Sequence, residues 1–169
     1  MTIPQVTQLR FARKKWLEGL DGLSAEDGES RIQPMNSISW MVGHLAQHEQ
    51  FCWQEAVRGD VQYPQLQQFR SGQPASTPNL TEVMTMWQHV VDTSENHLDQ
   101  LTVADLRIIP KIDGKPYREP LGSMFNRLIY HYWYHLGEMQ AVRQLLGHTG
   151  LPGFVGRMDS AFWYAPENP

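Results

Sequence analysis

The segment PLGSMFNRLIYHYWYHLGEMQAVRQLL, residues 120–146, is the most informative part of the sequence, because its apolar side chains recur at intervals of three and four. This spacing predicts a long amphipathic helix with one face directed into a core. We expect the helix to begin near Pro120 and to end at Gly147, since proline suits a first helical turn and glycine commonly follows a helix end. Its predicted inward face consists of Met124, Leu128, His131, His135, Glu138 and Val142.

Three further segments have the same periodicity and are separated by stretches rich in Gly, Pro, Ser and Asp. They cover approximately residues 7–20, a helix after Pro34 that ends near Arg58, and a helix from Asn79 or Thr81 to Leu101. Asn36 or Ser37 can cap the second of these helices. The sequence therefore predicts an all-α four-helix bundle. We expect a single domain over residues 1–169, because a chain of this length supplies one core.

The predicted inward faces of these three helices are mainly apolar. They consist of Leu9, Trp16, Leu17 and Leu20; of Met41, His44, Leu45, His48, Phe51, Cys52 and Glu55; and of Met84, Trp87, Val91 and Leu98. The basic cluster of the first helix, Arg10, Arg13, Lys14 and Lys15, is expected to face solvent. Glu55 and Glu138 are the only inward carboxylates that the pattern predicts.

The connections between the helices differ in character. Residues 62–78 are polar and proline-rich, so we expect a long surface connection that forms part of a pocket rim. Residues 108–117 contain Asp113-Gly114 between apolar residues, which predicts a small hairpin before the last helix. After residue 147 the chain is rich in loops, and the aromatic side chains of residues 162–164 are expected to pack on the bundle.

Composition excludes several classes of protein. The 14 Lys and Arg residues are outnumbered by 18 Asp and Glu residues, so no broad basic surface is available for nucleic acid. No apolar run approaches the roughly 20 residues that cross a membrane. Cys52 is the single cysteine and cannot form an intrachain disulfide. In the absence of an apolar secretory signal, we expect a cytoplasmic protein.

Histidine spacing provides the clearest chemical signal. His131 and His135 are one helical turn apart, so their imidazoles can reach one point, and His44 and His48 have the same spacing. Seven histidines give about 0.25 such pairs by chance, and two occur. An unpartnered ring on an inward face costs about 1–3 kcal/mol, which either a core hydrogen bond or a shared metal ion would remove. Spacing alone does not select between His44 and His48 as a third ligand.

Other histidine chemistry is excluded by the sequence. His89, His97 and His148 fall outside the two pairs, and we give them no role. Both pairs lack the glutamate of the His-Glu-x-x-His motif, which excludes the usual metalloprotease. A di-iron centre is also not expected, because it needs several inward carboxylates in Glu-x-x-His partnerships.

Two motifs resemble those of the DinB superfamily, a group of four-helix metal-binding bundles that includes thiol-dependent transferases and isomerases. They are SISWMVGHLA at residues 37–46 and the run from His131 through His135 to Gly137-Glu138, and the segment LPGFVG at residues 151–156 is similar as well. The resemblance implies that His44, His131 and His135 bind the metal and that His48 lies beside them. Many relatives have Gln at the position of Glu138, so a more acidic surrounding is expected here.

Three histidine ligands would leave a coordination position open for water or a substrate thiol. The sequence therefore predicts a zinc- or nickel-dependent transferase or hydrolase-like enzyme that acts on a small molecule, with a low-molecular-weight thiol as a candidate cosubstrate. His48, Glu138 and Tyr134 are candidates for relaying a proton, and Cys52 is expected to be a buried, inert thiol.

The alternative is a noncatalytic metal-binding or structural module, which could form a homodimer through an apolar helical face. A fourth protein ligand would favour the structural role. An open position lined by Trp53, Trp133 or Tyr134 would favour catalysis.

Overall fold

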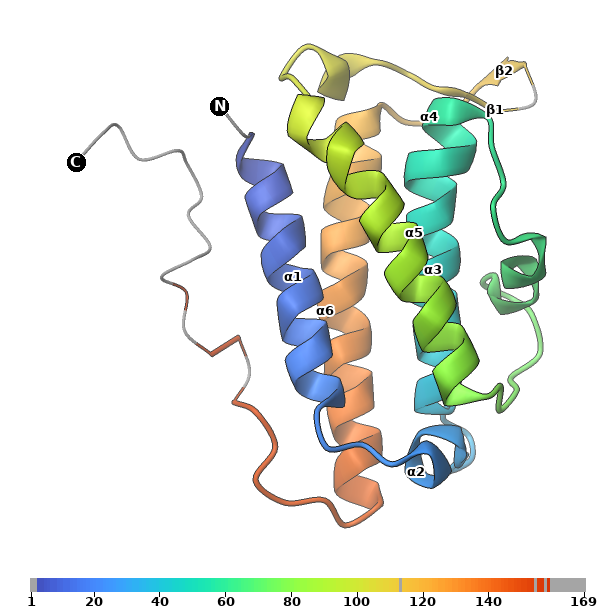
Figure 1. Cartoon of the computed structure of the whole chain (residues 1–169), viewed down its shortest axis with the longest axis vertical. Coiled ribbons are helices and arrows are strands. Elements are labelled where there is room, and N and C mark those ends of the chain that lie inside the picture. The colour runs from blue at the N-terminus through green and yellow to red at the C-terminus, as the bar shows by residue number, and fades with distance from the viewer. Residues whose placement is uncertain (1–2, 113, 154, 157, 159–169) are drawn as a thin grey trace.

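The computed structural model describes residues 3–112, 114–153, 155–156 and 158, and in this part of the chain four long helices form a bundle (Figure 1). The elements are α1 (Pro4–Leu20), α2 (Ala25–Glu29), α3 (Ile38–Gln50), the π-helical segment η1 (Phe51–Glu55), α4 (Ala56–Arg58), the 3₁₀ segment η2 (Pro64–Phe69), α5 (Leu80–Gln100), the 3₁₀ segment η3 (Asp105–Arg107), β1 (Lys111–Ile112), β2 (Lys115–Pro116) and α6 (Leu121–Leu145). Helix α1 packs mainly on α6, and α3 packs on α5 and α6. The predicted all-α bundle is confirmed.

The helix ends follow the local chemistry of the sequence. The side chain of Ser37 accepts a hydrogen bond from the backbone N–H of Trp40, and Asn79 does the same for Glu82 at the start of α5. Gly59 has a φ of 69° and ends the second long helical stretch. These three predicted boundaries are confirmed, whereas α1 begins at Pro4, earlier than predicted.

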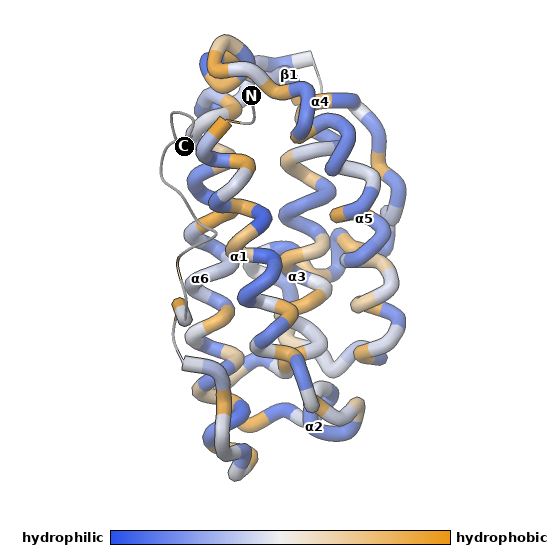
Figure 2. The backbone as a smooth tube through the Cα atoms, turned by 60° about the vertical axis from the view of Figure 1, so that its left-hand side comes forward, coloured by the Kyte–Doolittle hydropathy of each residue, from blue (hydrophilic) through white to orange (hydrophobic). Residues whose placement is uncertain are grey.

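The inward face of α1 differs from the prediction. Leu9, Arg13 and Trp16 are buried, at positions i, i+4 and i+7 of the helix. Leu17 is rotated by about 100° from Trp16 and is 40% exposed. Placing Leu17 inward and Arg13 in solvent was therefore wrong. Figure 2 shows the alternation of hydrophobic and hydrophilic positions along α1 and α6 that produces such faces.

A π-helical turn interrupts the second predicted helix. At the end of η1 the backbone N–H of Ala56 donates to the carbonyl oxygen of Phe51, five residues earlier, which is the π-helical spacing. Residues 52–54 of η1 are all buried, and so is every residue of α3 except His48, so burial along this stretch does not follow a single amphipathic stripe. Glu55, predicted to lie inward, is only half-buried. The predicted inward stripe therefore does not describe this helix, since its members His48 and Phe51 are only half-buried while the residues predicted to face outward in α3 are buried.

The connections carry short elements of their own. Strands β1 and β2 pair antiparallel next to Gly114, which has a φ of 74°, so the predicted hairpin is confirmed; Asp113 lies outside the described residues. The connection after α4 contains η2, which buries Leu66 and Phe69. The aromatic residues 162–164 also lie outside the described part. Among the described helices, none combines the length and hydrophobicity needed to cross a membrane.

Candidate metal centre

Three histidine side chains meet between α3 and α6. The Nε2 atom of His131 lies 3.1 Å from Nε2 of His44 and 2.9 Å from Nε2 of His135. Zinc bound tetrahedrally at 2.0–2.1 Å holds its nitrogen ligands about 3.4 Å apart, so this arrangement needs only a small expansion around an ion. The Trp40 ring stacks on His44 with 4.7 Å between centroids and restricts its rotation. These three histidines form a cluster that could hold a metal ion.

The hydrogen-bond partners of Nδ1 in His44 and His135 determine that Nε2 of each ring, which points into the cluster, carries a lone pair. His44 Nδ1 faces the backbone carbonyl oxygen of Phe69, which can only accept, so Nδ1–H is the donor. His135 Nδ1 lies 2.7 Å from the carboxylate of Glu138, which accepts in the same way. With the proton on Nδ1, Nε2 of each ring has a free lone pair directed at the cluster.

His48 completes the arrangement from the far side of His131. The two Nδ1 atoms lie 2.7 Å apart, and a hydrogen bond between them needs one donor. When His131 donates, its Nε2 atom also carries a lone pair, and three lone pairs then converge without a proton between them. A cation at this point would turn their mutual repulsion into attraction. The donor set therefore fits a divalent metal ion.

The imidazoles of His44, His48 and His131 are in the form that binds metals. Burial lowers the pKa of His44 to about 4, although the carbonyl group of Phe69 partly opposes the shift. Burial also lowers the pKa of His131 to about 2, assisted by the neighbouring His48 and His135. The pKa of His48 is lowered to about 4, again mainly by burial. At neutral pH these rings are uncharged, which is the state in which imidazole donates a lone pair to a metal.

The centre opens into a cavity of about 640 Å³. Its lining consists of three histidines, three arginines, three tyrosines and three other residues: His44, His48, His131, Arg70, Arg118, Arg127, Tyr117, Tyr130, Tyr134, Gln47, Phe51 and Ser71. The predicted rim from the connection after α4 is present, because Arg70 and Ser71 follow η2. Within the described residues the cluster contains three histidines and no fourth His, Cys, Asp or Glu ligand. The side facing the cavity is therefore open.

The other residues predicted near the site divide into two groups. Tyr134 lines the cavity and is 70% exposed. Trp53 instead lies in the core, and Trp133 packs against Phe11 with 5.9 Å between ring centroids. Cys52 is fully buried, and burial raises the pKa of its thiol. The predicted inert thiol is thus supported, while neither tryptophan lines the open position.

Sequence reasoning missed the buried carboxylate of α3. Glu49 is completely buried, and its two oxygens accept hydrogen bonds from Arg13 at 2.7 and 2.6 Å. The Tyr132 hydroxyl and the Trp53 indole N–H each donate to it at 2.7 Å. The prediction that Glu55 supplied the inward carboxylate of this helix was wrong. No sequence signal marked it, because Glu49 stands between His48 and Gln50 in a polar stretch and resembles a solvent-facing charge.

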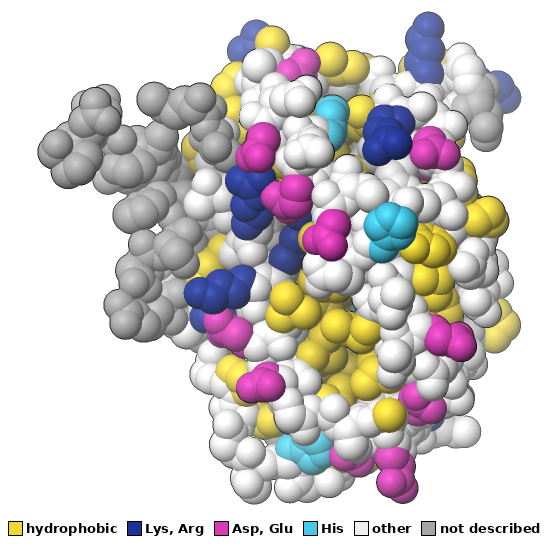
Figure 3. All heavy atoms as spheres, viewed as in Figure 1, with side chains coloured by type: hydrophobic (Ala, Val, Ile, Leu, Met, Phe, Trp, Pro, Cys, Tyr) yellow, Lys and Arg dark blue, Asp and Glu magenta, His cyan; other side chains and the backbone are white. Residues whose placement is uncertain are grey.

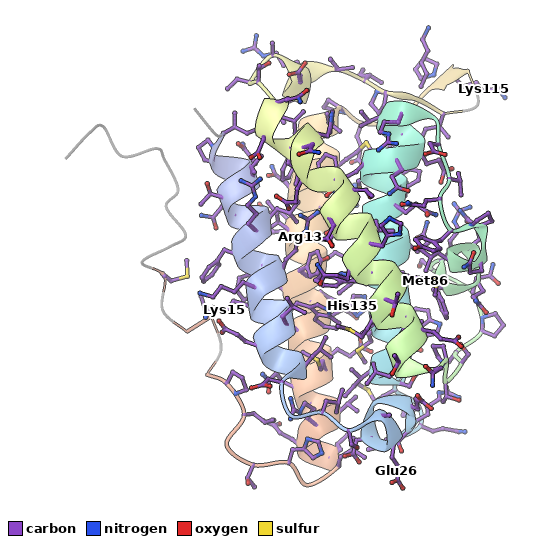
Figure 4. All side chains as sticks on the ribbon, viewed as in Figure 1. Arg13, Lys15, Glu26, Met86, Lys115 and His135 are labelled. Carbon is purple, nitrogen blue, oxygen red and sulfur yellow. The ribbon has the colours of Figure 1, made fainter. Side chains whose placement is uncertain are left out.

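The network around Glu49 joins all four long helices. Arg13 of α1 also donates to Glu95 of α5 at 2.6 Å, and Tyr132 of α6 accepts from Trp87 of α5 at 2.8 Å. Burial alone would lower the pKa of Arg13, but the charge of Glu49 outweighs it and raises that pKa. Arg13 and His135 both lie in the interior at mid-height of the bundle (Figure 4).

The network reaches the surface between α1 and α5. There Arg10 forms ion pairs with Glu95 and Asp99 at 2.6 and 2.7 Å. Figure 3 shows basic and acidic side chains next to one another on this face. Ion pairs therefore connect the buried Arg13 to solvent-exposed charges across one helix interface.

A four-helix bundle with a one-sided cluster of three histidines defines a class of helical proteins that could hold a single metal ion between two helices. Comparison with known families assigns the chain more closely. It belongs to the DinB superfamily, which it matches over residues 8–139, from α1 into α6. The matched region includes His44, His131 and His135, and the resemblance inferred from the motifs is confirmed. No protein of curated function matches the chain.

Proposed function

We propose that this chain is a metal-dependent enzyme that binds a divalent ion, zinc or nickel, through His44, His131 and His135 and acts on a small molecule. The observation that carries the proposal is the convergence of three Nε2 atoms at an open cavity. Catalytic metal sites keep such an open position, whereas structural sites are closed by a fourth protein ligand. The reaction we propose is a transfer or a hydrolysis.

A divalent ion in this position would supply a Lewis acid that lowers the pKa of a bound water or thiol. The protein contributes orientation and proton handling. The Glu138 carboxylate holds the Nδ1–H of His135, and Trp40 and the Phe69 carbonyl fix His44. His48 lines the cavity and is hydrogen-bonded to His131, so it is placed to exchange a proton with a substrate.

The cosubstrate that we propose is a low-molecular-weight thiol. Its support is the family resemblance together with the polar, open cavity beside the centre. Cys52 cannot supply the thiol itself, because it is buried in the core and its pKa is raised. A reactive thiol would therefore have to enter the cavity from solution.

Metal content tests the proposal directly. Elemental analysis of protein purified without a histidine tag should find about one zinc or nickel ion per chain. His135→Ala should lose this metal, while His89→Ala, at an exposed position on α5, should retain it. Retention of metal at parental affinity by His135→Ala would contradict the assignment. Metal-loaded protein would then be assayed for transfer between small thiols and electrophiles, with metal-free protein as the control.

A further inference from the structure

The charge of the cavity beside the three histidines differs from that of the whole chain. Its lining contains Arg70, Arg118 and Arg127 and no Asp or Glu, although the protein has a formal net charge of -4. Four other surface cavities in the described part of the chain each include at least one acidic residue. Of these five cavities, only the one that opens onto the metal centre is lined by basic side chains without an acidic one.

Two of the three arginines form no ion pair among the described residues; Glu119 acts electrostatically on Arg118, but its carboxylate is hydrogen-bonded to Arg127. Arg127 is held by Glu119 through two hydrogen bonds of 2.9 and 2.6 Å, so its charge is balanced. Neither Arg70 nor Arg118 has a carboxylate oxygen within the 4.0 Å of an ion pair in that part of the chain. Their guanidinium groups are available to a ligand.

Local contacts tie both free arginines to the metal centre. Arg70 directly follows Phe69, whose carbonyl group accepts the hydrogen bond of His44. The guanidinium of Arg118 lies 5.6 Å from the centroid of the Tyr117 ring, and that ring packs at 5.5 Å on Phe51 of the π-helical segment. The cavity is thus bounded by arginines from two connections, one of which contacts α3 through His44 and the other η1 through Phe51.

We propose that Arg70 and Arg118 bind the oxyanion of a small organic anion, either a carboxylate or a phosphate ester, whose other end lies at the metal centre. The inference rests on the proposed function, because it names the substrate class of the same site. A guanidinium group matches either oxyanion with two parallel hydrogen bonds. A cavity of about 640 Å³ suits a small molecule, and the exposed rings of Tyr130 and Tyr134 offer apolar contact to its body.

Three related probes separate charge from shape. Benzoate, phenyl phosphate and neutral benzamide would be titrated into metal-loaded and into chelator-treated protein by calorimetry. We expect both anions to bind and benzamide to bind at least about tenfold more weakly. The order of the two anions distinguishes a carboxylate site from a phosphate site.

The test variant is the double substitution Arg70→Gln and Arg118→Gln. Its matched control is Arg107→Gln, at an exposed position on η3. The double variant should weaken anion binding by about tenfold or more, whereas Arg107→Gln should bind as the parent does. Circular dichroism would verify that each variant is folded. Equal binding of benzamide, undiminished binding by the double variant, or no binding of either anion would overturn the inference.

The two proposals fail independently in this design. If chelator-treated protein retains arginine-dependent anion binding and no metal binds at the histidines, the oxyanion site at Arg70 and Arg118 stands and the metal-dependent function fails. If one metal ion binds per chain and anion binding does not depend on Arg70 and Arg118, the metal site stands and the substrate class is wrong.

Discussion

Adjacent residues on α3 and α6 enter two different environments. His48 and His131 line an open cavity, whereas Glu49 and Tyr132, the next residues in the chain, lie in a closed network in the core. In the network every oxygen of Glu49 has at least two donors. In the histidine centre, three Nε2 atoms lie together, and when His131 donates to His48 no proton lies between their lone pairs. The closed region satisfies its polar groups within the protein, whereas the open region could hold a metal ion.

This difference indicates that the two faces of the same helices have different roles: one holds the helices together and the other forms the histidine centre. The network joins four helices and fixes the register of α3 against α6. That register is what brings His44 of α3 to His131 of α6. A buried charge pair contributes little net stability, but it is costly to disrupt, so it specifies one packing arrangement. We therefore expect substitutions in the two regions to affect different properties.

The largest effect on stability is expected from Glu49→Ala. Removal of this carboxylate leaves the Arg13 guanidinium buried without its main partner, so the free energy of unfolding should fall by about 3–5 kcal/mol. Urea denaturation followed by circular dichroism measures the loss. Asp92→Ala, at an exposed position on α5, is the control and should stay within about 0.5 kcal/mol of the parent. A similar small change in both variants would show that the network does not hold the helices together.

The next effect is a gain that depends on metal. Zinc at about 100 times its dissociation constant should raise the free energy of unfolding by about 2.7 kcal/mol. His131→Ala should abolish this gain, because its Nε2 atom lies between those of His44 and His135. Without metal, the free energy of unfolding of His131→Ala should lie within about 1 kcal/mol of that of the parent. The reason is that removal of the His131 imidazole relieves the repulsion between the facing lone pairs. His89→Ala should keep the metal-dependent gain in the free energy of unfolding. Loss of this gain in His89→Ala would argue against a specific site at His44, His131 and His135.

How much could be predicted from the sequence differs between the two regions. The helices and the pairing of His131 with His135 follow from periodicity, which is a local property of α6. Selection of His44 over His48 required the family resemblance, because both histidines have the same spacing. In the structure, His48 contacts the Nδ1 side of His131 and not the Nε2 cluster.

The closed network could not be predicted in the same way. Arg13 and Glu49 lie on different helices, 36 residues apart, and each alone resembles a solvent-facing charge. Their burial depends on how α1 rotates against α3, and the pattern of α1 wrongly predicted Leu17 inward and Arg13 in solvent. The π-helical turn had no sequence marker that we recognised, and it moved Glu55 outward. Arg70 and Arg118 are in connections, where no periodicity places a side chain.

A smaller effect is expected at Glu138, which contacts the metal centre only through His135. Glu138→Ala should weaken metal binding by about tenfold, because His135 loses the partner that orients its ring. Glu138→Gln should lose less, since the amide oxygen can still accept the Nδ1–H of His135. Metal competition titrations with a chelating dye measure both variants. Equal losses would show that the negative charge, and not the orientation, is what Glu138 contributes.

The smallest effect on metal binding is expected at Cys52, which lies on the closed side of η1. The Cys52 thiol is buried, and burial followed by the charge of Glu49 raises its pKa, so little thiolate forms near neutral pH. Cys52→Ala should therefore leave the metal content unchanged and cost about 1 kcal/mol of stability through the space it leaves. In the folded parent protein, a thiol reagent such as dithionitrobenzoate should react slowly, and it should react rapidly once denaturant unfolds the chain. Because this is the only cysteine, the released chromophore reports on it alone. Rapid reaction in the folded state would mean that the core behind the histidine centre opens to solvent, and the contrast between a closed network and an open site would no longer hold.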